Sequence, residues 1–137
     1  MVPMTAHTLR PEPMGEDIPT IRMHLWLETK EGLFFGMGRA MLLAKIAEHG
    51  SIKKAADVLG MSYRAAWGKI KKSEQVLGIK LIVQSGSKRE GHALTESGKM
   101  LMEQFILWFD EVEKEALKKA ATIFPWPLQS YRDRSRK

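Results

Sequence analysis

The chain has 137 residues, 44% of them apolar, which is enough for one domain with one modest core. It has no run of about 18 apolar residues that could span a membrane and no apolar N-terminal stretch typical of a signal peptide, so we expect a cytoplasmic protein without a membrane partner. The absence of cysteine excludes disulfides, thiolate metal sites and cysteine nucleophiles.

The net charge of +6 is concentrated in one segment of the chain. Between Ser51 and His92 there are nine lysine and arginine residues and three acidic residues, whereas the remainder carries 13 of each sign. A neutral scaffold with one basic segment suggests that a polyanion binds there. The alternative is an ordinary charged surface, because clusters of charge are common on proteins.

The N-terminal part of the chain predicts a leader followed by a hairpin. Residues 1–20 contain four prolines and little apolar periodicity, which predicts a disordered leader. Beyond them, Met23, Leu25 and Leu27 alternate with more polar residues, and the polar turn ETKEG separates them from Leu33–Phe35. This pattern predicts a β-hairpin at the start of the domain.

Three helices are predicted next, each bounded by a local stop or start signal. The stretch RAMLLAKIAEHG has helical apolar spacing and ends at Gly50. Ser51 can cap a short second helix that ends at Gly60, and Ser62 can cap a third that ends at Gly78. Two short helices with so brief a connection form a helix-turn-helix pattern. The positions expected to be buried are Leu42, Leu43, Ile46, Ala47, Ile52, Ala55, Ala56, Leu59, Ala66, Ile70 and Leu77.

The C-terminal half predicts a wing and a long helix. The β-branched run IKLIVQ, the basic loop SGSKREGH and Ala93–Leu94 read as two short strands around a loop. Thr95 can cap a last helix that ends near residue 121. The predicted fold class is therefore mainly α with small β, a winged helix-turn-helix. We expect a leader over 1–20, this domain over 21–124, and a basic tail over 125–137.

The last helix is apolar over roughly half of its circumference, wider than the ~100° stripe of an ordinary surface helix. Leaving three or four large apolar side chains in water would cost about 1.5 to 3 kcal/mol each, so a homodimer through this helix, about residues 95–121, is the preferred interpretation. The alternative is that the helix packs on the hairpin within one chain. The residues predicted to carry dimerisation are Leu101, Phe105, Trp108, Phe109 and Val112.

The third helix carries the candidate base-reading residues on its outer face. Arg64 has a planar fork that can donate to O6 and N7 of guanine, and Ser62 and Tyr63 can reach phosphates or base edges. Trp67 can contact sugars, a thymine methyl or a phosphate, or instead cover the hydrophobic core against the second helix. For Tyr63 and Arg64 the alternative is an ordinary solvated face.

Five basic residues are predicted to bind the DNA backbone rather than the bases. They are Lys69, Lys71 and Lys72 on the third helix and Lys88 and Arg89 in the wing, which can alternatively be a solvated loop. No catalytic residues are predicted, because no nucleophile motif or phosphate-binding loop is present. The four histidines lack metal-ligand spacing, so neither a metal nor a cofactor is expected.

The stretches GMGRAMLLAKIAEHGSI, SYRAAW and LTESGK resemble the winged helix-turn-helix domain of LysR-type regulators and, more closely, the N-terminal DNA-binding domain of the ModE family of molybdate-responsive repressors. The resemblance covers about residues 21–121. It implies a dimeric transcription factor with the third helix in the major groove, where Ser62, Tyr63, Arg64 and Trp67 face DNA. It also implies that Trp67 both covers the core and contacts DNA.

Two features depart from the ModE pattern. The wing, SGSKREGH, is more basic and less glycine-rich, and no molybdate-binding domain follows the terminal helix, so no small-molecule effector is evident. The expected function is a sequence-specific regulator that binds double-stranded DNA as a homodimer, on a pseudo-palindromic operator with half-sites about 34 Å apart. A link to molybdenum-related genes comes only from the resemblance. The alternative is a winged-helix interaction or adaptor module without sequence-specific DNA binding.

Overall fold

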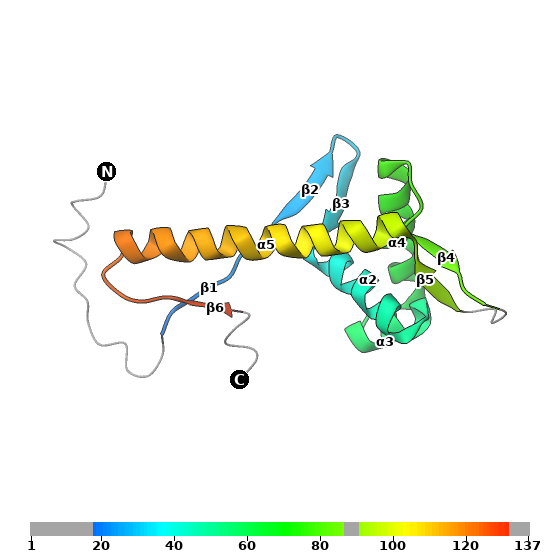
Figure 1. Cartoon of the computed structure of the whole chain (residues 1–137), viewed down its shortest axis with the longest axis horizontal. Coiled ribbons are helices and arrows are strands. Elements are labelled where there is room, and N and C mark those ends of the chain that lie inside the picture. The colour runs from blue at the N-terminus through cyan, green and yellow to red at the C-terminus, as the bar shows by residue number, and fades with distance from the viewer. Residues whose placement is uncertain (1–17, 87–90, 132–137) are drawn as a thin grey trace. The chain divides into compact units, whose positions relative to one another are not determined.

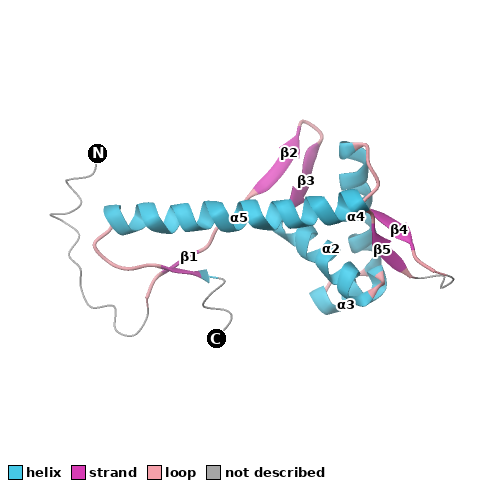
Figure 2. Ribbon diagram, in the orientation of Figure 1, coloured by secondary structure: helices cyan, strands magenta, loops and turns pink. Residues whose placement is uncertain are grey.

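The computed structural model describes residues 18–86 and 91–131, and most of this part is helical (Figures 1 and 2). The described residues form two compact units: residues 24–108 without 87–90, and residues 18–23 together with 109–131. In chain order the elements are β1 (Thr20–Ile21), β2 (Trp26–Thr29), β3 (Gly32–Gly36), α2 (Met37–His49), α3 (Ile52–Leu59), α4 (Tyr63–Leu77), β4 (Ile82–Gln84), β5 (His92–Leu94), α5 (Glu96–Ile123) and β6 (Gln129–Ser130).

The predicted hairpin is present, formed by the antiparallel strands β2 and β3 (Figure 1). It begins at Trp26 and pairs Leu27 with Phe35. Because neighbouring residues in a strand point to opposite faces, Phe35 is buried in the core while Trp26 lies on the outer face and is exposed. The hairpin thus contributes one side to the core of the first unit.

The three predicted helices, α2, α3 and α4, are confirmed together with their boundaries. They end at Gly50, Gly60 and Gly78, each in the left-handed region with φ of 73°, 73° and 71°. Ser51 and Ser62 cap α3 and α4, because each hydroxyl accepts a hydrogen bond from the backbone N–H three residues later, at 2.9 and 3.0 Å. The helix-turn-helix pattern in the sequence therefore corresponds to two capped helices in the structure.

The core of this unit lies between the hairpin, the three helices and the start of α5. Most of the predicted positions are buried, and Leu59 and Leu77 are half-buried. The expectation for Ala47 was wrong, since it is exposed: the ~100° step from Ile46 carries its side chain away from the buried face. The buried apolar residues are Phe35, Ala40, Leu42, Leu43, Ile46, Ile52, Ala55, Ala56, Ala66, Ile70, Leu81, Ile82 and Phe105.

The first turn of α5 packs directly against the chain that leads into the wing. The Thr95 hydroxyl accepts a hydrogen bond from the Gly98 N–H (2.9 Å), as expected for a cap, and donates to the Lys80 carbonyl (2.6 Å). A Cβ atom on Gly98 would lie 2.1 Å from the Leu81 carbonyl oxygen. Only glycine therefore permits this backbone-to-backbone contact, which positions α5.

The wing consists of strands β4 and β5, which are antiparallel as predicted. Ile82 pairs with Leu94, and Gln84 pairs with His92. The loop between the strands, residues 87–90, lies outside the described residues, and so do the predicted DNA contacts Lys88 and Arg89. The structure therefore describes the two strands at the base of the wing, but not the loop that joins them.

The second unit contains a strand pair that joins residues from both ends of the chain. Strands β1 and β6 are parallel, with Thr20 opposite Gln129 and Ile21 opposite Ser130, and the Arg22 guanidinium lies 4.2 Å from the centroid of the Tyr131 ring. This pairing joins residues on both sides of the boundaries expected at 20/21 and 124/125, and those boundaries stay a prediction. Most of the predicted leader, residues 1–17, and the last part of the predicted tail, residues 132–137, lie outside the described residues.

Candidate nucleic-acid interface

Helix α4 has one face in the core and the opposite face in solvent. Ala66 and Ile70 are buried, whereas Tyr63, Arg64 and Trp67 are exposed. Residues three and four apart share a helix face, so the first two turns present these polar and aromatic side chains together. The orientation of α4 that the sequence predicted is therefore confirmed.

Trp67 is a surface residue rather than a core residue. It leaves 45% of its surface exposed, and the Lys71 ammonium lies 5.3 Å from the centroid of its ring. This distance is within the range of a cation–π interaction. The half of the indole that remains exposed lies on the same helix as Arg64 and is accessible to a ligand.

Glu74 joins the end of α4 to the beginning of the wing. Its carboxylate accepts hydrogen bonds from the backbone N–H groups of Leu81 (2.8 Å) and Ile82 (3.3 Å) and from the Lys71 ammonium (3.2 Å). Burial alone would raise the pKa of Glu74, but these hydrogen bonds and the charge of Lys71 together lower it below its usual value. Glu74 is only 7% exposed, so its contacts replace hydration by water.

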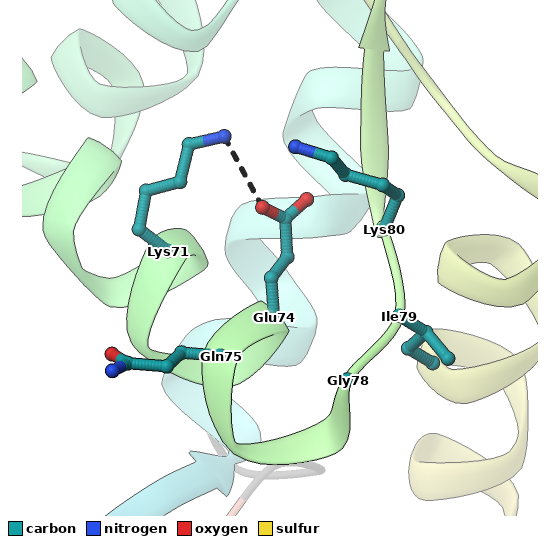
Figure 3. A pocket seen from close by; sticks show the side chains of 6 residues that line it. All are labelled: Lys71, Glu74, Gln75, Gly78, Ile79 and Lys80. Carbon is teal, nitrogen blue, oxygen red and sulfur yellow. Dashed lines mark hydrogen bonds and ion pairs between the residues drawn. The ribbon is translucent and has the colours of Figure 1, made fainter.

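Sequence reasoning missed Glu74, although one signal was present. The residue lies four positions after Ile70, on the apolar face of α4, where a carboxylate is unexpected. It borders an open pocket of about 360 Å³, where the side chains of Lys71 and Lys80 extend on either side of the Glu74 carboxylate (Figure 3). The pocket is lined by Lys71, Glu74, Gln75, Gly78, Ile79 and Lys80.

The inner flank of α4 is hydrogen-bonded to the hairpin and to α2. The Lys72 ammonium donates to the Glu31 carbonyl (2.7 Å), and the Ser73 hydroxyl donates to the Phe34 carbonyl. The Lys69 carbonyl accepts a hydrogen bond from Arg39 Nε (3.3 Å). Lys72 therefore has a structural partner within the chain, and its predicted contact with the DNA backbone stays a prediction.

A second basic surface lies at the N-terminus of α3, and sequence reasoning did not select it as a site. Lys53 and Lys54 lie in the first turn of this helix, directly after the capping residue Ser51. Their position in the first turn of a capped helix is the signal that could have indicated an anion-binding surface. With neighbouring residues they border a pocket of about 380 Å³, lined by His49, Gly50, Ser51, Lys53, Lys54, Asp57 and Gly91.

The five residues predicted to carry dimerisation differ in their exposure within the single chain. Phe105 is 3% exposed and makes an edge-to-face contact with Phe35, with ring centroids 5.3 Å apart. Phe109 is also buried, Leu101 and Val112 are half-buried, and Trp108 is 42% exposed. The dimer role of the five residues stays a prediction, and the chain by itself already buries Phe105 and Phe109.

Within the described ranges 18–86 and 91–131, no three histidine, aspartate or glutamate side chains are placed to hold a metal ion together. Nor is any helix in that part of the chain both long and apolar enough to cross a membrane.

Two solved structures of similar fold are DNA-binding domains in complex with DNA. The CbnR DNA-binding domain in complex with DNA is 20% identical, with a TM-score of 0.54, covering 64% of this chain and 98% of that one. The BenM DNA-binding domain in complex with catB site 1 DNA is also 20% identical, with a TM-score of 0.51, covering 64% and 92%. At this identity the likeness shows the fold alone: a winged helix-turn-helix with a long C-terminal helix, as predicted.

Sequence comparison extends this result. Residues 38–99 match the family model described as "Bacterial regulatory helix-turn-helix protein, lysR family". A stretch of 75 residues is 36% identical to the molybdenum-pterin-binding protein MopB of Rhodobacter capsulatus and covers 53% of this chain. The match spans only 28% of the length of MopB, so it concerns one part of that protein.

The contacts of Glu74 predict an acid-sensitive stability. Because the pKa of Glu74 is lower in the folded chain than its ordinary value of 4.5, its contribution is complete above that value and is lost as the pH falls through the folded pKa. We expect the free energy of unfolding, measured with urea between about pH 3 and pH 7, to fall at the acidic end. Glu74→Gln should reduce that dependence and cost about 1 to 3 kcal/mol at neutral pH.

The control is Glu111→Gln, which removes a carboxylate from an exposed pair with Lys114 at 3.7 Å. This variant should keep both the stability and the pH dependence of the wild type. Identical acid profiles for Glu74→Gln and the wild type would contradict the role assigned to Glu74.

Proposed function

We propose that this chain is a transcriptional regulator that recognises specific double-stranded DNA sequences with α4. The observation that carries the proposal is the exposed face of α4, where Tyr63, Arg64 and Trp67 project opposite the buried Ala66 and Ile70. The face belongs to a helix-turn-helix within the basic segment of the chain, which is the charge distribution expected of a DNA-binding surface. The lysR-family match over residues 38–99 and the DNA complexes of CbnR and BenM support the same function.

Each residue of this face has a chemical role in the proposed complex. Arg64 donates two hydrogen bonds to a guanine edge in the major groove, and Tyr63 and Ser62 contact a phosphate or base edge near the N-terminus of α4. Trp67 packs its exposed half on a sugar or a thymine methyl. We assign the sequence-independent part of the affinity to lysines that contact phosphates, including Lys53 at the start of α3. Such contacts position the protein on the duplex without reading its sequence.

We also propose that the regulator acts as a homodimer through α5. This helix has 28 residues and is therefore about 42 Å long. Leu101, Trp108 and Val112 follow one another on one flank of α5, and all three remain exposed or half-buried in the single chain. Burying this flank against its copy would remove it from water and present two α4 helices to half-sites about one helical turn, or 34 Å, apart.

Selection of bound duplexes from a random pool tests the function. We expect enrichment of an inverted repeat, and the similarity to MopB leads us to expect matches upstream of molybdenum-related genes. Neutralising about 6 to 10 phosphates should weaken binding of the enriched duplex by ~10³ to 10⁵ between 50 and 200 mM salt. A lack of enrichment, with binding that is weak and insensitive to salt, would reject the proposal in favour of a protein-interaction module.

Arg64→Ala tests which residue reads the bases. The loss of a bidentate guanine contact should cost about 1 to 3 kcal/mol on the selected duplex and relax the preference at one base pair, with little change on random DNA. Lys114→Ala removes the same charge from α5, where Lys114 is 73% exposed, and should leave the preference unchanged. Binding titrations on both duplexes provide the measurement, and equal losses of Arg64→Ala on both would show that Arg64 only contacts the backbone.

Two neighbouring substitutions on α5 test the dimer. Trp108 and Leu107 are both exposed, at 42% and 59%, but lie about 100° apart around the helix. Trp108→Glu should convert the dimer to a monomer in sedimentation equilibrium, because it places a charge in the proposed interface. Leu107→Glu should leave the dimer intact, and circular dichroism should show that both variants stay helical. A monomeric wild type, or dissociation by Leu107→Glu alone, would contradict the proposed surface.

A further inference from the structure

Gly68 lies within α4 at a position where nothing in the described part of the chain requires a glycine. Glycine is the least favourable residue in a helix interior apart from proline, because it loses the most backbone entropy on folding. The backbone of Gly68 is not in the left-handed region, and a Cβ atom added to it would meet no atom of residues 18–86 or 91–131 within 4 Å. Alanine would therefore fit without strain and would stabilise the helix.

The other glycines within the described helices provide a comparison. Gly98 in α5 has a clear cause, since its Cβ would lie 2.1 Å from the Leu81 carbonyl oxygen, where two segments of backbone touch. Gly38 lies in the first turn of α2, where a Cβ would also meet nothing within 4 Å. Gly68 differs from Gly38 in its surroundings: it lies on the exposed face of the helix that carries the candidate DNA contacts.

The neighbours of Gly68 on that face are long side chains. Arg64 lies one turn before it, Lys71 lies three residues after it, and both share its side of the helix. Trp67 is the adjacent exposed residue, and the Lys71 ammonium is held over its ring and against the Glu74 carboxylate. At Gly68 the backbone itself is thus exposed on this face of α4, between larger side chains.

We propose that Gly68 lets the backbone of α4 approach double-stranded DNA at close contact and so sets the depth at which the helix lies in the major groove. This inference rests on the proposed function of α4. A methyl group at this position would meet the edge of a base pair or the sugar-phosphate backbone before Arg64 reached its full contact. Gly68 is accordingly a positioning residue: it makes no hydrogen bond through a side chain but determines which other side chains can reach the bases.

The test uses the full chain with Gly68→Ala and Gly68→Leu, and with Gly38→Ala as the matched control. Alanine and leucine have similar, high helix propensities, so both Gly68 variants should melt higher than the wild type, by about 2 to 5 °C at equal protein concentration. On the duplex selected by the wild type, Gly68→Ala should bind on the order of tenfold more weakly, the loss of about one base contact. Gly68→Leu should bind more weakly still, whereas Gly38→Ala should bind like the wild type.

The inference is supported if both Gly68 variants melt at a higher temperature than the wild type but bind the duplex more weakly, with Gly68→Leu weaker than Gly68→Ala. If the wild type binds its duplex and both Gly68 variants bind equally well, the inference is overturned while the proposed function stands. A lower melting temperature of Gly68→Ala would show that the glycine serves the folded chain itself, which also overturns it. If the wild type selects no duplex at all, the proposed function fails and the inference fails with it.

Discussion

The buried carboxylate of Glu74 is the interaction on which the arrangement of α4 and the wing depends. A charged group that is 7% exposed is costly unless donors replace its hydration, and here two backbone N–H groups and one ammonium do so. The N–H groups belong to Leu81 and Ile82, the residues with which the chain enters β4. One side chain therefore joins the last turns of α4 to the start of the wing and pairs with Lys71, whose ammonium lies over the Trp67 ring. Removing it would leave the Leu81 N–H without its acceptor inside the fold.

Helix α4 carries the side chains that hold the fold together on one face and the candidate DNA contacts on the opposite face. Its inner side carries the polar anchors to neighbouring elements, including Ser73 to the hairpin and the Lys69 carbonyl to α2. Its outer side, with Arg64 and Trp67, makes few contacts within the chain and leaves its donors available. A surface that reads DNA needs such a division, because side chains that reach base edges must not already be committed to the fold. Gly68 also lies on this outer face, where it has no side chain that could contact the rest of the fold.

The long helix α5 is positioned by contacts of two kinds. At its first turn, Gly98 allows backbone to touch backbone at Leu81, and about two turns later Phe105 meets Phe35 edge to face. These contacts account for the part of the apolar surface that the single chain buries, and they explain how a broad apolar helix serves the fold and still leaves Trp108 exposed. Proteins only 20% identical share this fold because such patterns of burial and capping can be met by many sequences.

The amino-acid sequence by itself determined the features that depend on neighbours in the chain. The serine and threonine caps, the glycine stops and the alternation of the hairpin act within a few residues, so they could be predicted with their boundaries, and the outward face of α4 followed from the 3.6-residue period. The tertiary structure decided what depends on distant partners: the burial of Glu74, the bond from Lys72 to the Glu31 carbonyl, and the pairing of β1 with β6 across the chain. Each of these is set by a group dozens of residues away or by a buried site that forms only when the elements pack together. Local propensity cannot specify which lysine meets a carbonyl or which phenylalanine meets another, because those outcomes depend on the assembled core.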